Sequence, residues 1–586
     1  MKKIKVPILF IPLIFIILTS EVMELRSEVK SLLPNSEMKV VRVSKNAVLT
    51  DIMGEDIVNT HYIISHKHNL SRYSEYLTIG NNCILEFRRG NFNNGRLKCS
   101  NIVIKGRQPR FVDTYIEIND ANSIMLKNVT ATYSYAVDDF VRIMNSENIV
   151  IDGVKVVFDE GNRQLPSGDY IEAEGFDLTS CKNISFSDCS IKNSKSLYAD
   201  SDHGSLICKN CICITVNGCF SSGGHNEIFN FIGCEKVKIT NTIIDGGHGS
   251  AIATQGGKDI TIDNCTSINV GASGYSLNSK KMRITNCIAK DWHYFNGITL
   301  GHPTEGFRVS DVVVSNCKMI LSDNKDSNKK CALGGVIEGP VTIKDCQAEV
   351  SRICSFDGVY KSEDVSLYLD NNYFDLFEGD LFAETFRASG VLNLTISNNT
   401  FIGNANITGY IKKKAGVPAS NWKITGNTFK NLKQVTIVPP SVKGNTSSGF
   451  FEFSNNTIEN ADVSILRYYY GKQELTNELI AIPQYSKRII ANNRITGLTG
   501  GSVKLFRADS SAGLETEFRG NYIDSDNILD VLDLNYSDDS NEESMISIQN
   551  NTFLKGADIK NAHLLVNFRN VKFDGNIKDG SFYNPR

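Results

Sequence analysis

The sequence predicts an all-β chain folded as a parallel β-solenoid, and three observations carry that prediction. One short phrase recurs along most of the chain: an alternating apolar stretch, a polar pair and a second apolar stretch. Apolar and polar residues alternate within each copy, which is the period of a strand. The copies return after 22, 30 and 29 residues where cysteines mark them, at Cys265, Cys287, Cys317 and Cys346. Units this short cannot pack alone, so they must stack on their neighbours as coils.

The first element, residues 1–20, is typical of a secretory signal peptide. MKKIK supplies positive charge, and residues 6–18 form an apolar core. That core has about 13 residues, whereas a membrane span needs about 20. We expect cleavage near Ser20 and a secreted, periplasmic or cell-surface protein with no membrane span in the mature chain. Retention of the segment as an N-terminal anchor is the alternative.

The second element, residues 21–60, is predicted to be a lead-in or cap with a short helix at 21–33 and a strand at 38–43. From residue 61 the coils begin, and they are predicted to continue to residue 586. The copies of the phrase lie at 183–191, 236–244, 259–267, 281–289, 311–319, 340–348, 392–401, 421–429, 450–458, 487–495, 514–523 and 544–553.

The polar pair in each copy predicts a tight turn between two strands. Such a turn needs a residue that tolerates left-handed backbone angles, and Asn does so better than most residues. Equivalent positions stack at about the 4.8 Å strand spacing, so side chains in one slot form a ladder. In the C-terminal half the predicted ladder is Asn372, Asn399, Asn427, Asn456, Asn493, Asn521 and Asn551. In the N-terminal half the same slot holds Cys189, Cys219, Cys265, Cys287, Cys317 and Cys346, as small buried apolar residues.

The cysteines predict free thiols rather than disulfides. The chain has 15 of them, and many occupy the repeat slot, where stacked side chains point the same way and not at each other. Cys208, Cys211 and Cys213 form a C-x2-C-x-C motif, for which core packing and a zinc site are both open.

The repeats and their NN and NC turns resemble the right-handed parallel β-helix proteins of the pectate-lyase-like superfamily. Residues 62–97 are also similar to the opening coils of secreted bacterial β-helix proteins. The resemblance covers roughly residues 60–586 and implies a right-handed parallel β-helix in a single elongated domain. It does not decide the activity, because this superfamily includes lyases, hydrolases, esterases, epimerases and adhesins without catalytic activity.

The charge narrows the range of partners. The formal net charge is −3 and the isoelectric point is about 6.3, so no global basic field attracts nucleic acid. An acidic polysaccharide would require a local basic groove. We therefore expect a polysaccharide or other glycan as the partner, and no nucleic acid.

The candidate catalytic residues lie where three neighbouring coils each begin a strand after a histidine. His203, His225 and His248 are 22 and 23 residues apart, one coil each, so they are predicted to stack along one edge. Acidic residues beside them could supply a general acid and a general base: Asp200, Asp202, Glu227 and Asp245. Two alternatives stay open: a structural ladder in which His replaces Asn, and a metal held by His from adjacent coils.

The excursion at 291–308 supplies candidate substrate-binding residues. It combines aromatic rings with a cation, as a sugar or uronate site requires, and the residues are Trp292, His293, Tyr294, His302 and Arg308.

Three classes of function compete. The first is a glycoside hydrolase or polysaccharide lyase acting in a groove along one sheet, with no certain cofactor and a divalent cation, calcium, only for a lyase. The lyase signatures of the superfamily, an Arg-bearing catalytic strand with an Asp cluster for calcium, are not evident. The carboxyls at the edge therefore favour hydrolysis. The second class is a non-catalytic adhesin or glycan-binding β-helix, and the third is a structural protein.

Overall fold

The fold is an all-β, right-handed parallel β-helix, which confirms the predicted fold class. The computed structural model describes residues 38–71, 76–107, 109–133, 139–158, 175–192, 204–224, 227–302, 308–322, 331–350, 352–358, 365–376, 386–389, 393–403, 406–409, 421–432, 434–437, 449–465, 485–497, 506–509, 515–535, 545–560 and 570–583. The predicted signal peptide and the predicted helix at 21–33 lie outside these residues.

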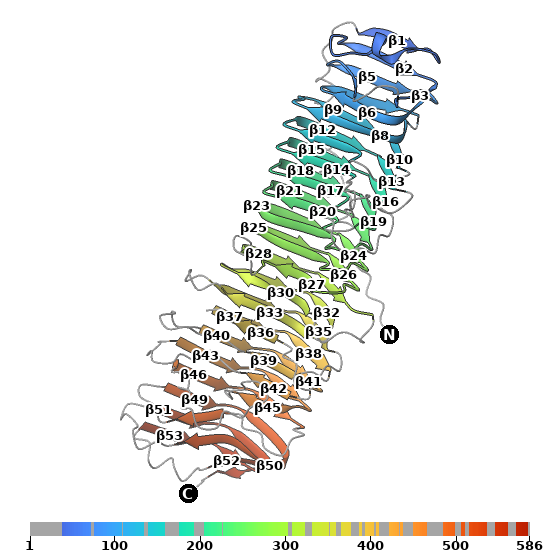
Figure 1. The fold of residues 1–586 in the computed structure, drawn as a ribbon. Coiled ribbons are helices and arrows are strands. Elements are labelled where there is room, and N and C mark those ends of the chain that lie inside the picture. The colour runs from blue at the N-terminus through green and yellow to red at the C-terminus, as the bar shows by residue number, and fades with distance from the viewer. Residues whose placement is uncertain are drawn as a thin grey trace, which may run out of the picture. The chain divides into compact units, whose positions relative to one another are not determined.

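The chain divides into two compact units, which we describe separately. Unit 1 comprises residues 1–196 and 203–221, and unit 2 comprises residues 197–202 and 222–586. Each coil of either unit carries up to three strands, and each strand pairs in parallel with its equivalent in the next coil (Figure 1). We call the strand before the polar-pair turn the first column, the strand after it the second column, and the remaining strand the third column.

Unit 1 begins with a strand in the position predicted for the lead-in. Residues Lys39–Val43 (β1) already pair in parallel with β2, and the described residues contain one short helix, α2 (Leu49–Ile52). The first column of unit 1 is β1, β2 (Thr60–Ile64), β5 (Cys83–Phe87), β7 (Ile102–Gly106), β9 (Ile124–Lys127), β12 (Glu147–Asp152), β15 (Lys182–Ser187) and β18 (Ile212–Asn217). The second column is β3 (Lys67–Asn69), β10 (Thr130–Tyr133), β13 (Lys155–Phe158), β16 (Ser190–Lys192) and β19 (Phe220–Ser222). The third column is β4 (Leu77–Thr78), β11 (Val141–Met144), β14 (Phe176–Thr179) and β17 (Leu206–Lys209), and the long strands β6 (Asn91–Cys99) and β8 (Arg110–Asn119) span the second and third columns.

Unit 2 repeats the same coil. Its first column is β21 (Glu235–Thr240), β28 (Ser310–Ser315), β31 (Val341–Lys344), β34 (Ser366–Asp370), β37 (Asn393–Ser397), β40 (Asn421–Thr425), β43 (Gly449–Ser454), β46 (Tyr485–Ala491), β49 (Glu515–Arg519), β51 (Met545–Gln549) and β53 (Asn570–Asp574). Its second column is β22 (Ile243–Asp245), β24 (Thr266–Ile268), β26 (Ile288–Lys290), β29 (Lys318–Ile320), β32 (Gln347–Val350), β35 (Tyr373–Leu376), β38 (Thr400–Gly403), β41 (Thr428–Lys430), β44 (Thr457–Glu459), β47 (Arg494–Thr496) and β54 (Ile577–Lys578).

The third column of unit 2 follows the longest connections and includes strands that bend into the next column. Its members are β20 (Phe229–Ile232), β27 (Asn296–Leu300), β30 (Cys331–Ile337), β33 (Arg352–Gly358), β36 (Phe386–Ser389), β39 (Asn406–Gly409), β42 (Gln434–Ile437), β45 (Asp462–Ile465) and β48 (Phe506–Asp509). Strands β23 (Ile252–Asp263) and β25 (Tyr275–Thr285) run from the third column into the first, and β50 (Tyr522–Asn535) and β52 (Thr552–Lys560) run from the second into the third. The last strand, β55 (Ser581–Phe582), is antiparallel to β54.

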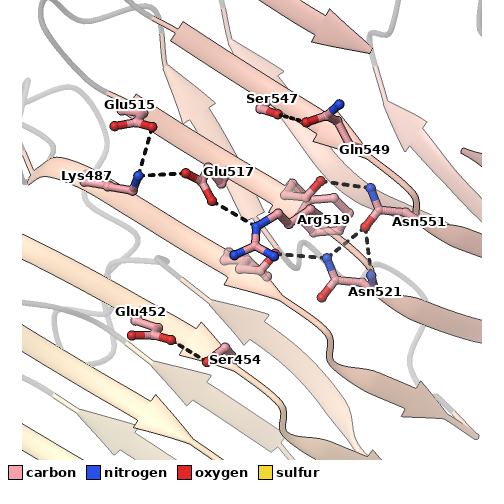
Figure 2. A network of polar contacts seen from close by, with 12 residues as sticks. Glu452, Ser454, Lys487, Glu515, Glu517, Arg519, Asn521, Ser547, Gln549 and Asn551 are labelled. Carbon is pink, nitrogen blue, oxygen red and sulfur yellow. Dashed lines mark hydrogen bonds and ion pairs between the residues drawn. The ribbon is translucent and has the colours of Figure 1, made fainter. Parts of the chain in front are cut away.

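The predicted turn ladder is present, and it extends one coil further than predicted. Asn372, Asn399 and the later members are almost fully buried, and each donates from its side-chain amide to the Oδ1 of the next, from Asn372 as far as Asn576. Figure 2 shows the Asn521–Asn551 bond, which is 2.9 Å long. The residue before each ladder position has a positive φ, for example 57° at Asn398, as the left-handed turn requires.

The interior of each unit is filled by apolar side chains from all three columns. In unit 1 the Phe87, Phe92 and Phe111 rings pack edge to face, with centroids 5.2 to 6.2 Å apart. In unit 2 the Phe374, Phe401 and Phe429 rings stack one coil above another at 5.2 and 5.0 Å. A fully buried Phe contributes about 2 kcal/mol by burial, so these stacks tie successive coils together.

The cysteines are free, as predicted. All 14 cysteines whose side chains the structure describes are free of disulfides, and all but Cys213 are buried. Cys213 has a left-handed φ of 61° on the outer side of its strand, while Cys211 packs against the backbone N–H of Cys181 at 3.3 Å. No group of three or more His, Cys, Asp or Glu side chains within the described ranges is arranged to hold a metal ion. No helix in that part of the chain is long and apolar enough to cross a membrane.

Candidate functional site

The structure describes only part of the predicted catalytic set. Four residues of that set lie outside the described residues, and for them the prediction stands as made: Asp200, Asp202, His203 and His225. The described residues of the set belong to unit 2, where they lie between the second and third columns. We call the group formed by Glu227, Asp245, His248, Tyr294 and Phe295 the His248 corner.

Stacked backbone turns build this corner. The His248 N–H donates to the Gly224 carbonyl at 2.9 Å, and the Gly271 N–H donates to the Gly247 carbonyl at 2.8 Å. The turns approach so closely that a Cβ on Gly271 would lie 2.0 Å from the His248 carbonyl oxygen. Only glycine fits there, so Gly271 holds the His248 turn against the coil that follows.

An aromatic surface adjoins His248. The His248 and Tyr294 ring centroids are 6.4 Å apart and the rings are tilted by 48°. Tyr294 is 66% exposed and Phe295 is 57% exposed, although most large apolar side chains of the described chain are buried. Two neighbouring exposed rings form a surface on which a sugar ring can stack. Phe295 was missed in the sequence, although it follows Tyr294 directly.

Glu227 is the carboxyl with the most altered environment at the corner. Its Oε2 accepts a hydrogen bond from the Ser250 backbone N–H at 3.0 Å, in the turn that carries His248. Burial raises the pKa of Glu227 above that of an ordinary carboxyl, and the hydrogen bonding to Ser250 only partly offsets this rise. The next residue, Ile228, is fully buried, while Glu227 is partly exposed.

Asp245 is the exposed carboxylate of the corner. It is the last residue of β22, three residues before His248, and its Oδ1 accepts a hydrogen bond from the Asn269 side-chain amide at 3.2 Å. Glu227 and Asp245 therefore differ in environment: one carboxyl is mostly buried, and the other is open to solvent.

The predicted substrate-binding residues of the excursion at 291–308 differ in burial and in position along the coil. Trp292 is fully buried and its indole N–H donates to the Phe295 carbonyl at 3.1 Å, so it offers no exposed ring face. His293 is exposed, and its backbone N–H donates to the Val270 carbonyl at 3.0 Å. His302 and Arg308 follow the far end of β27, and Arg308 leads into β28. Along the chain, the whole of β27 therefore lies between Tyr294 and these two residues.

The outward face of the third column carries further polar groups that the sequence did not indicate. The register aligns Asn230, Ala253, Ser276 and Thr299 in four successive coils. Asn230 is only 7% exposed, and its side-chain oxygen has no hydrogen-bond partner. Finding this row requires the strand register, because the four residues share no motif.

Comparison with known proteins was made by sequence and by structure. No protein-family model and no curated protein sequence matches the chain. A solved structure of the tailspike protein of E. coli bacteriophage HK620 in complex with a pentasaccharide is 10% identical, with 76% of each chain covered and a TM-score of 0.32. The catalytic domain of a GH87 α-1,3-glucanase in complex with tetrasaccharides is 13% identical, with 80% of this chain and 70% of that chain covered and a TM-score of 0.33. Similarity at this level carries no information about the activity of this chain.

Proposed function

We propose that this protein is a polysaccharide-active β-helix protein that acts outside the cytoplasm and contacts its glycan at the His248 corner. The observation that carries the proposal is the exposed Tyr294–Phe295 pair beside His248. Aromatic rings bury large apolar area with few rotatable bonds, and Tyr adds a polar group. The signal-like residues 1–20 support a place of action outside the cytoplasm.

Of the two cleavage reactions, hydrolysis matches the described carboxyls better than elimination. A glycoside hydrolase needs one carboxyl that keeps its proton and a second that is ionised. The raised pKa of Glu227 suits the general acid, which protonates the leaving glycosidic oxygen. The solvent-exposed Asp245 suits the carboxylate that activates water or attacks the sugar.

A second candidate is glycan binding without cleavage. It is favoured by the hydrogen bond between Glu227 and the Ser250 N–H, which gives Glu227 a role in fixing the turn even if it transfers no proton. The aromatic pair would then be the whole functional surface.

The test is the activity of the chain against neutral and acidic polysaccharides, with both reducing ends and the ultraviolet absorbance of unsaturated uronates measured. New reducing ends without absorbance are expected. Glu227→Gln should lower cleavage by at least a hundredfold while binding stays intact, because glutamine keeps an acceptor for the Ser250 N–H but cannot donate an acidic proton. In the wild type, cleavage should decline as the pH rises through the raised pKa of Glu227.

The aromatic pair is tested separately. The double variant Tyr294→Ala, Phe295→Ala should weaken glycan binding about tenfold, and the matched control is Tyr373→Ala, an exposed ring on β35 of the second column. If ultraviolet absorbance of unsaturated uronates appeared together with the reducing ends, the reaction would be elimination and not hydrolysis. If the double variant bound glycan as well as the wild type, the His248 corner would be removed from the proposal. If the wild type bound glycan without cleaving it and the double variant did not bind, the second candidate would be established.

A further inference from the structure

A column of left-handed residues runs along the outer side of the first column, and its composition differs between the two units. In unit 1 the position is held by Asn148, Asn183 and Cys213, and the Asn183 side-chain amide donates to the Asn148 Oδ1 at 3.0 Å. In unit 2 the equivalent residues, by the pairing of their neighbours, are Lys236, Asp259, Lys281 and Asp311. Their φ angles are 56°, 59°, 53° and 58°.

This composition is unfavourable for the backbone. Asn adopts the left-handed conformation readily, whereas Lys does so at a cost in strain. The position therefore carries lysine twice where asparagine would be more stable. Strain that is kept where a better residue is available indicates a function for the side chain.

The four charges alternate in sign along the stack, but they do not neutralise one another. Among the described residues, none of Lys236, Asp259, Lys281 and Asp311 makes a side-chain hydrogen bond or an ion pair. Their direct neighbours behave differently, because Lys258 binds Glu235 at 3.0 Å and Lys280 binds Glu338 at 3.5 Å. The charges of the column are thus available to a ligand.

A surface pocket of about 540 Å³ lies over this column. Its charged and polar lining comprises Asp259, Thr261, Lys281, Arg283 and Asp311. Arg283 and Lys238 occupy the outward row next to the column, two residues further along their strands, and within the described part of the chain neither has an ion-pair partner. The pocket lining holds two cations, Lys281 and Arg283, and two carboxylates, Asp259 and Asp311, and the equivalent positions of β21 add Lys236 and Lys238 beside it.

We propose that this pocket on β23, β25 and β28 is a second saccharide-binding site, selective for a sugar unit that carries a carboxylate. Arg283 and Lys281 bind the carboxylate, since guanidinium matches its two oxygens. Asp259 and Asp311 accept hydrogen bonds from the sugar hydroxyls. The same two carboxylates repel densely charged polyanions, which separates a uronate from a nucleic acid.

The site is on a different column from the His248 corner and does not require that the corner cleaves a glycan. If both are correct, it would hold an acidic part of the polymer away from the point of contact at Tyr294 and Phe295. The inference depends on the proposed function only for the expectation that the ligand belongs to a polysaccharide.

The experiment is calorimetric titration of the chain with four probes: trigalacturonate, a neutral galactose trisaccharide, sodium sulfate and a DNA oligonucleotide. Trigalacturonate should bind, with an affinity that falls as salt is added, because the contacts are exposed ion pairs. The neutral trisaccharide should bind at least tenfold more weakly. Sulfate binding as tightly as the uronate would show a general anion site and overturn the assignment to a saccharide, as would equally tight binding of a DNA oligonucleotide.

The informative variant is Lys281→Asn, because a lysine that binds the uronate and a lysine without a binding role predict different uronate affinities for it. A binding role predicts at least a fivefold loss of uronate affinity together with a raised melting temperature, since Asn relieves the strain of the left-handed position. Arg283→Ala should lower the affinity by a similar factor. Unchanged affinity in both variants would refute the site.

Matched controls are present on the same strands. Lys280→Ala and Lys258→Ala remove a lysine directly beside the pocket residues, but their partners are Glu338 and Glu235, so uronate affinity should stay within twofold of the wild type. Loss of affinity in these controls equal to that in Lys281→Asn would reduce the site to general surface charge. Uronate binding should persist in the Tyr294→Ala, Phe295→Ala variant, so failure of the corner and failure of this site are distinguishable.

Discussion

The buried slot after the left-handed turn residue is lined mostly by cysteine in the stretch from Cys189 to Cys346 and by asparagine in the stretch from Asn372 to Asn576. The same backbone turn is thus built with two different side chains. In both, a left-handed residue comes first, Asn264 at φ 52° in one and Asn398 at φ 57° in the other. In both, the next side chain is buried. The backbone turn is therefore set by the residue before the slot and tolerates either residue in the slot.

What differs is how successive coils are connected. The Cys265 thiol makes long contacts to backbone carbonyls, 3.4 Å to Asp263 and 3.6 Å to Ile239, and otherwise neighbours the Cys287 thiol of the next coil. The Asn427 backbone N–H and side-chain amide both donate to the Asn456 Oδ1 at 3.0 Å, and the same amide donates to the Ile396 carbonyl at 2.8 Å. Sulfur is a weak partner, so the thiol slot fills space while the amide slot links neighbouring coils.

The largest expected effect is the loss of one ladder amide. Asn456→Ala leaves the Asn427 N–H and the Ile424 carbonyl without their partners inside the protein. Each buried group without a hydrogen bond costs about 1–3 kcal/mol, so we expect roughly 3 kcal/mol of destabilisation. Urea unfolding followed by circular dichroism measures it. A cost below about 1 kcal/mol would mean that the amide slot, like the thiol slot, only fills space.

A smaller effect is expected when the two chemistries are exchanged. Cys287→Asn places an amide between Cys265 and Cys317. Where the two ladders meet, the Cys346 N–H donates to the Asn372 Oδ1 and the Asn372 amide donates to the Ile343 carbonyl, so the new amide should also find backbone partners. Its remaining amide hydrogen would face the Cys317 sulfur, a poor acceptor, and this should cost about 2 kcal/mol. Cys287→Ala is the control and should cost about 1 kcal/mol, because it removes only a small apolar volume. If the asparagine variant proved more stable than the alanine variant, the two slots would be equivalent and the comparison would fail.

The smallest effect is expected on the outer face of the asparagine-lined region. There Lys487 binds Glu515 at 2.9 Å and Glu517 at 2.7 Å, and Arg519 binds Glu517 at 3.0 Å (Figure 2). Exposed pairs of this kind contribute about 0.5 kcal/mol each, so Lys487→Met should cost no more than about 1 kcal/mol, and less at high salt. If Lys487→Met cost more than Asn456→Ala, the surface ion pairs and not the buried Asn ladder would be the main link between coils.

The acid dependence of the same variant has a defined sign. Burial by itself would raise the pKa of Glu517, but hydrogen bonds from Lys487 and Arg519 outweigh it and the pKa is lowered. The stabilisation is therefore present above the ordinary carboxyl range and is lost as the pH falls through the lowered value. The stability difference between wild type and Lys487→Met should shrink on acidification, and a difference that grows would contradict the ion-pair assignment.

The fold was predictable because the turn of each coil has a recognisable sequence pattern. A left-handed residue followed by a buried slot residue is visible as NN, NC or GN, and strand alternation surrounds it. Asn576 was missed although its coil, VKFDGNI, carries the same GN turn as the coils of Asn427 and Asn521.

Much less of the candidate site was predictable. His248 and Tyr294 do lie next to each other, and Glu227 does bind the turn that carries His248, because equivalent turns of neighbouring coils must stack. Sequence spacing could not show that Trp292 is buried or that β27 separates Arg308 from the corner, since both depend on which way the chain bends after β26. The charged column at Lys281 depends on backbone angles that no residue pattern displays.

The antiparallel strand β55 has a consequence for solubility. Every other described pairing is parallel, so β54 would otherwise offer its backbone groups in the orientation that another coil of the same kind needs. Strand β55 occupies that edge in the opposite direction, and the Tyr583 ring packs on Phe553 at 5.6 Å. An open strand edge is a template for the addition of further chains, and this fold-back covers the edge of β54 against such addition, whereas β53 pairs only with β51 among the described strands.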